Sequence, residues 1–126
     1  MDLENVRRLK REWVQKDRLL ARGYYLIRGA KRRAAAKELP FDLDAHAADV
    51  QARIDRGVCE ISGLPLDLSA KRGFASPSLD RINPSRGYVY DNIRVVCHLM
   101  NCALGTWGED KLLAVLRSWE GARNER

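Results

Sequence analysis

Long apolar stretches are missing from this chain of 126 residues. No segment approaches the ~20 apolar residues that span a bilayer. The charged N-terminus also lacks the apolar run of a secretion signal. Cysteine is scarce and odd in number, with Cys59, Cys97 and Cys102. We therefore expect reduced thiols, a cytoplasmic location and no membrane partner.

Internal repeats and low-complexity segments are absent as well, and the length suits one domain with a modest core. We divide the chain into a basic helical arm (1–38), a main domain (39–120) and a polar tail (121–126).

Positive charge is concentrated in the N-terminal third. Residues 1–38 hold 12 Lys and Arg against 5 Asp and Glu, a net of +7, whereas residues 39–126 hold 11 against 12. Such a basic arm indicates a polyanion partner, chiefly nucleic acid. The alternative is a solvated basic helix face.

Apolar periodicity predicts helices over residues 3–22, 24–37 and about 44–56, and a last helix that begins at 107–110. We expect Gly23 to end or bend the first helix. Asp42 or Asp44 is expected to cap the third helix.

The stretch from Ser76 to Gly105 is expected to form a hairpin laid against a helix, around which the rest of the chain is organised. Residues 77–82 alternate like a strand, and Asn83 to Gly87 carry a dense turn signal. We expect residues 88–90 to return as a second strand. Apolar spacing then predicts a helix over residues 93–104.

Two incomplete metal knuckles flank this stretch. Cys59-x-x-Ser62 and Cys97-x-x-Met100 each lack a second thiolate. We therefore expect Cys59 and Cys97 to be buried apolar groups and disfavour structural zinc. Recruitment of His98 and Cys102 to complete a zinc site is the alternative.

Asp80 and Asn101 are the candidate metal ligands. A side chain near the end of the first strand and one on the helix behind it can converge on one point. Both offer oxygen, which Mg²⁺ prefers, and a substrate phosphate can complete such a site. We expect the Asn92 amide to bond the backbone across the hairpin.

The segment SLDRINPSRGYVYDNIRVVC-x3-N resembles the HNH endonucleases of the ββα-metal (His-Me finger) superfamily, in particular small phage and prophage proteins. Weaker resemblance extends the match to about residues 24–118. The resemblance implies an α+β fold, mostly helical, with a ββα-metal hairpin-plus-helix core and basic N-terminal helices. It implies a Mg²⁺- or Mn²⁺-dependent DNA endonuclease of a bacterial or phage-infected cell.

By this resemblance, Asp80 and Asn101 match the metal ligands of strand and helix, and Asn92 matches the middle Asn. Arg81 stands where most members carry the histidine that activates water. Arginine stays protonated and has no acceptor, so it cannot be an ordinary general base. His98, a metal-bound hydroxide or a substrate phosphate could take the proton. Arg81 could instead hold the scissile phosphate, or the protein could only bind DNA.

Double-stranded DNA is the expected partner, bound by basic residues of the second helix and of the loops. An acidic protein partner is a further alternative, and the sequence leaves monomer and homodimer open. The expected DNA-binding residues are Arg28, Lys31, Arg32, Arg33, Lys71, Arg72 and Arg86.

Overall fold

The computed structural model describes residues 2–20, 22–69 and 72–126, with residues 13–20 described as backbone only. These residues form helices and one two-stranded antiparallel sheet, which confirms the α+β class. In chain order the elements are α1 (Leu3–Leu20), α2 (Arg22–Ala36), the 3-10 turn η1 (Leu43–His46), α3 (Ala47–Asp55), β1 (Pro77–Arg81), the 3-10 turns η2 (Pro84–Arg86) and η3 (Tyr90–Asn92), β2 (Ile93–Cys97), α4 (His98–Leu104) and α5 (Glu109–Asn124).

The sheet pairs β1 with β2, in a register that sets Leu79 opposite Val95 and Asp80 opposite Arg94. The first strand was predicted correctly. The second was not: residues 88–90 do not form it, and residues 93–97, predicted as helix, do. Val95 and Val96 are both fully buried, and successive strand residues point to opposite faces. Burial on both faces removes the alternation that identifies a strand.

The connection between the strands is fixed by a close backbone approach at Gly87. Gly87 has φ 79°, and a Cβ there would lie 2.3 Å from the carbonyl oxygen of Pro40. Next to it, the Tyr88 amide donates to Pro40 and the Tyr88 carbonyl accepts from Asp42. The predicted turn is confirmed, and it joins the hairpin to the segment that follows α2.

The core lies between α2, α3 and the sheet. Cys59 and Cys97 are both buried, as expected for small apolar groups. The core contains side chains from α2, η1, α3 and both strands, namely Ile27, Ala30, Ala34, Leu43, Val50, Ile54, Leu79, Ile93, Val95 and Val96.

Two details of the helical half differ from expectation. Gly23 does not end α1; it lies in the first turn of α2, where its amide donates to Gln51 Oε1 at 2.6 Å. Asp42 precedes η1 without capping it, because its carboxylate accepts the Tyr90 amide at 2.8 Å. The third helix thus starts as the 3-10 turn η1.

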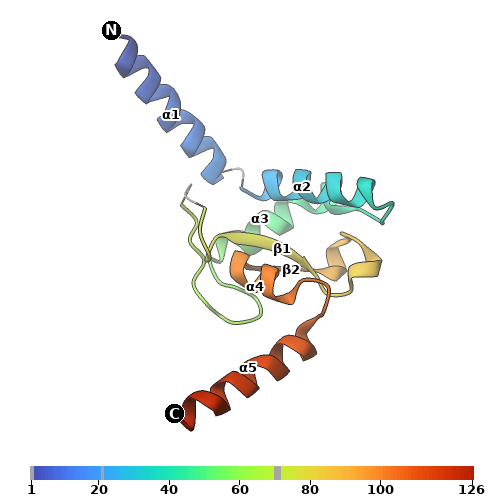
Figure 1. The fold of residues 1–126 in the computed structure, drawn as a ribbon. Helices are drawn as coiled ribbons and strands as arrows, with labels where there is room; N and C mark the ends of the chain where they lie inside the picture. Colours follow the sequence, from blue (N-terminus) through green and yellow to red (C-terminus); the bar gives the residue numbers. More distant parts are fainter. Residues whose placement is uncertain (1, 21, 70–71) are drawn as a thin grey trace.

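The terminal helices α1 and α5 extend away from the body formed by the other elements (Figure 1). α5 continues to Asn124, so it includes the first part of the expected polar tail. Within the described residues, no helix is both long and apolar enough to cross a membrane.

Candidate nucleic-acid interface

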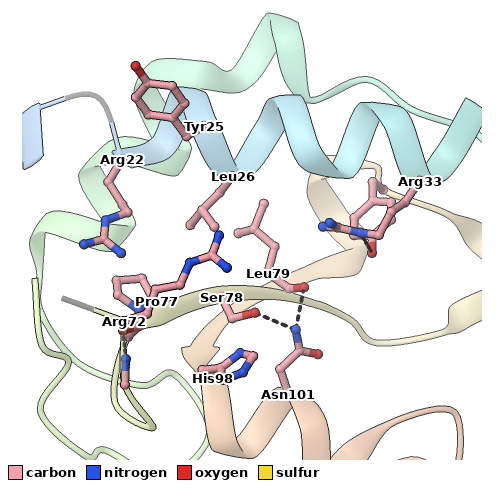
Figure 2. Close-up of a pocket in the computed structure, with 13 residues that line it drawn as sticks. Arg22, Tyr25, Leu26, Arg33, Arg72, Pro77, Ser78, Leu79, His98 and Asn101 are labelled. Atoms are coloured by element: carbon pink, nitrogen blue, oxygen red, sulfur yellow. Dashed lines mark hydrogen bonds between the residues drawn. The ribbon is translucent and has the colours of Figure 1, made fainter. Parts of the chain in front are cut away.

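A cavity of about 800 Å³ lies between α2 and α4, with β1 along its floor (Figure 2). α2 contributes Arg22 and Arg33, and the loop before β1 contributes Arg72. His98 and Asn101 reach it from α4. The described residues that line the cavity include three arginines and one histidine but no aspartate or glutamate.

Arg22 and Arg72 strengthen the positive character of one end. Burial lowers the pKa of the Arg22 guanidinium; Asp67 opposes this shift, and the charge of Arg72 adds to it. Arg22 also donates to the backbone carbonyl of Ser69. Two cations that repel each other beside a cavity favour an anion between them.

Arg33 is held at the other end by Tyr88. Its Nε donates to the Tyr88 hydroxyl at 3.0 Å, and its guanidinium lies 5.3 Å from the ring centroid. Among the described residues, no carboxylate comes within 4.0 Å of the Arg33 guanidinium. The remaining donors of Arg33 are thus available to a ligand.

The structure places only some of the expected DNA-binding residues at the cavity. Arg33 and Arg72 line the cavity. Lys31 and Arg86 instead pair with Asp44 and Asp91, at 2.7 Å and 3.1 Å. Of the other three, Arg28 and Arg32 are exposed on α2 without lining the cavity, and Lys71 lies outside the described residues.

Arg22, which sequence reasoning missed, belongs with the cavity arginines. It lies eleven residues before Arg33, close to three helical turns, so the two side chains share one face of α2. Helical spacing between the arginines was the signal that could have found it. The predicted helix began only at Tyr24, and Arg22 therefore stood outside it.

Asp80 lies apart from the cavity and is bound by an arginine. Its side chain is 5% exposed, and its Oδ2 accepts from Arg94 Nη2 at 2.7 Å and from Arg94 Nε at 3.1 Å. Arg94 also donates to Glu109 at 2.9 Å. Burial by itself lowers the pKa of Arg94, but the hydrogen bonds to Asp80 and Glu109 outweigh it and raise the pKa.

Asn101 lines the cavity, whereas Asp80 and Arg94 do not. Its Nδ2 donates to Ser78 Oγ at 2.6 Å and to the Leu79 carbonyl at 3.3 Å (Figure 2). Among the described residues, no hydrogen bond joins Asn101 to Asp80. The two predicted metal ligands are therefore on adjacent elements but engage different partners.

Arg94 occupies Oδ2 of Asp80, one of the two carboxylate oxygens that a divalent cation would use. The Asp80 carboxylate already receives two hydrogen bonds from a guanidinium, which neutralises its charge. Within the described part of the chain, no three His, Cys, Asp or Glu side chains gather at one point. His98 contacts Cys102, with Nε2 and Sγ 3.6 Å apart, and no third such ligand joins them there.

Arg81 makes two contacts within the hairpin. Its Nη1 donates to the Pro84 carbonyl at 3.0 Å, and its guanidinium lies 5.1 Å from the Tyr88 ring centroid. Tyr88 thus contacts two guanidinium groups, those of Arg33 and Arg81. Arg81 supports the loop that carries Tyr88.

Asn92 holds the hairpin connection, as the sequence predicted. It is fully buried, and its Nδ2 donates to the carbonyls of Asn83 and Gly87 at 2.9 Å and 2.7 Å. Its Oδ1 accepts the Asn83 amide at 3.0 Å. All three bonds run to backbone atoms, so Asn92 shapes the loop.

Comparison with known proteins does not assign this chain to a family. No protein family, curated protein or solved structure matches this chain.

Proposed function

We propose that this protein binds nucleic acid and holds the sugar-phosphate backbone in the cavity between α2 and α4. The proposal rests on the residues that line this cavity. Arg22, Arg33, Arg72 and His98 are among them, and no described aspartate or glutamate is. Guanidinium groups bind phosphate oxygens through paired donors. The cytoplasm of a bacterial or phage-infected cell is the location that goes with this proposal.

The chemistry of the lining favours contacts to the backbone of the nucleic acid over reading of bases. Ser78 and Asn101 add short polar groups beside the arginines, and Tyr25 is partly exposed at the rim. Phosphate contacts fix position and carry no sequence information. The excess charge of residues 1–38 supports the same partner.

Substitution of a cavity arginine tests the proposal. We expect Arg33→Met to weaken binding of a fluorescein-labelled DNA duplex about tenfold, or ~1.4 kcal/mol. Arg28→Met is the matched control, because Arg28 is exposed on the same helix but does not line the cavity. Fluorescence anisotropy gives both affinities. An equal loss in the two variants would place binding on the whole basic surface instead.

A second candidate is the endonuclease activity that the sequence resemblance implies. It is favoured by the order of β1, β2 and α4, and by Asn92, which braces the connection between the strands. The contacts of Asp80 and Arg81 count against it, because one is neutralised by Arg94 and the other contacts Pro84 and Tyr88.

A plasmid-nicking assay separates the two candidates. We expect the wild-type protein to bind plasmid DNA and to leave it supercoiled with Mg²⁺, Mn²⁺ or EDTA. Metal-dependent nicking that disappears in Asp80→Ala would establish the nuclease. A silent wild type with an active Arg81→His would show that one position separates binding from cleavage.

A further inference from the structure

Tyr25 is an exposed aromatic residue at the rim of the cavity. It lies on α2 and lines the cavity together with Arg22 and Arg72, yet it is 43% exposed (Figure 2). Because Tyr25 follows Arg22 by three residues, the two side chains are neighbours on one face of the helix. Proteins that bind single strands of nucleic acid combine such cations, which hold phosphates, with aromatic rings on which bases stack.

Phe74 adds a second exposed ring, on the loop that carries Arg72. It is 63% exposed and follows Arg72 and Gly73, which both line the cavity. The backbone is held in place here, because the Phe74 carbonyl accepts the amide of Leu99 in the first turn of α4 at 2.9 Å. A large apolar side chain is therefore exposed to solvent on a fixed segment beside the cavity.

The size of the cavity suits part of a single strand. Cavities of about 300–1,000 Å³ enclose ligands of drug size, and this one has a volume of about 800 Å³. One backbone of a duplex can reach the arginines from outside, but its bases remain stacked on each other within the duplex. Contact between the face of a base and Tyr25 therefore requires an unpaired base.

We propose that the cavity takes a strand with unpaired bases, which stack on Tyr25 and Phe74 while the cavity arginines hold the phosphates. This inference rests on the proposed function, because it names the form of nucleic acid that the same cavity binds. Every base has a π face, so stacking adds affinity without reading the sequence. It therefore agrees with a lining that contacts the backbone.

Affinities for a short fluorescein-labelled DNA strand and for its duplex test the proposal. We expect Tyr25→Leu to weaken binding of the strand about tenfold and to leave the duplex nearly unchanged. Phe74→Leu should show the same selective loss. Tyr25→Phe should bind as the wild type does, because it keeps the ring. Tyr24→Leu is the matched control, since Tyr24 is 60% exposed on the same helix but does not line the cavity.

Equal losses for strand and duplex in Tyr25→Leu would overturn the proposal, and so would an equal loss for the strand in Tyr24→Leu. If Arg33→Met weakens binding of both forms while Tyr25→Leu weakens neither, the proposed function holds and this inference fails. A wild-type protein that binds neither form would instead overturn the proposed function.

Photo-cross-linking locates the bases directly. The probe is a DNA strand that carries 5-iododeoxyuridine, which links to aromatic side chains on irradiation. We expect the linked peptides to contain Tyr25 or Phe74. Linkage at Trp107, which is 78% exposed and does not line the cavity, would place the bases elsewhere and overturn the proposal.

Discussion

At the scale of single residues, the contacts of Asp80 decide the character of the site. The sequence places this carboxylate where a metal ligand is expected, and the structure gives it the guanidinium of Arg94. A buried carboxylate needs a compensating positive charge or hydrogen bonds. Here Arg94 of the same chain supplies both the positive charge and the hydrogen bonds, and it also pairs with Glu109 on α5.

Removal of one partner of this pair should be costly. We expect Arg94→Met to lower the free energy of unfolding by about 3 kcal/mol, because it leaves Asp80 buried without its partner. The double variant with Asp80→Asn should recover part of this loss. Urea denaturation of the four proteins in a double-mutant cycle measures the coupling. Additive losses would show that the pair contributes nothing beyond its separate groups.

Glu60 gives a second prediction, in the pH dependence of stability. Its Oε1 accepts the Val95 amide at 2.7 Å, and Arg53 Nε donates to Oε2 at 2.9 Å. Burial raises the pKa of Glu60, but the hydrogen bonds from Arg53 and Val95 outweigh it and lower the pKa. A lowered pKa stabilises the fold above the unfolded value of about 4.3, and this contribution is lost as pH falls.

We therefore expect the stability advantage of the wild type over Glu60→Gln to shrink between about pH 6 and about pH 3. Urea midpoints across this range provide the measurement. A constant difference between the two proteins would contradict the link between Glu60 ionisation and folding.

At the scale of elements, the hairpin connection is fixed by Gly87 more than by either strand. We expect Gly87→Ala to lower the free energy of unfolding by about 3 kcal/mol, since the new methyl would collide with the Pro40 carbonyl and φ is positive. Gly63→Ala is the control: it has φ 76° and nothing within 4 Å of a new Cβ. It should cost only about 1 kcal/mol.

Thermal or urea unfolding of both variants separates collision from backbone preference. Equal losses at Gly63 and Gly87 would mean that the approach to Pro40 does not matter. A larger loss at Gly87 would confirm that this contact holds the hairpin against the segment after α2.

At the scale of the whole molecule, positive charge is concentrated on α1 and around the cavity. We expect these two groups of cations to contribute differently to DNA binding. The described cations of α1, including Arg7, Arg8, Lys10 and Arg11, lie on a helix that extends from the body (Figure 1). Arg22, Arg33 and Arg72 surround the cavity. Distant exposed charges act through long-range attraction, which salt screens, whereas direct phosphate contacts persist better.

Replacement of the four α1 cations by glutamine should therefore weaken DNA binding mainly at low salt. Arg33→Met should reduce the salt slope by about one, so its deficit should narrow as salt rises but still be measurable at about 0.2 M salt. Anisotropy titrations over a salt series give both slopes. Identical salt dependence for the two variants would remove the distinction between arm and cavity.

The sequence by itself determined the features that depend on local chemistry. Apolar spacing located the helices, alternation located β1, and the Asn83–Gly87 signal located the turn. Asn92 was assigned its role from its place at the junction of hairpin and helix, where an amide can bond backbone atoms across the hairpin, and the hydrogen bonds confirm it. The concentration of positive charge in residues 1–38 also follows from composition alone.

Only the tertiary structure decided the rest, because these features depend on neighbours that are distant in sequence. β2 is a strand because it pairs with β1. Both of its faces are covered, so its sequence lacks the alternation of apolar and polar residues that identifies a strand. The Asp80 carboxylate pairs with Arg94 because the register sets them opposite each other. Arg72 joins Arg22 and Arg33 at one cavity because a loop folds beside α2, and no local pattern encodes that contact.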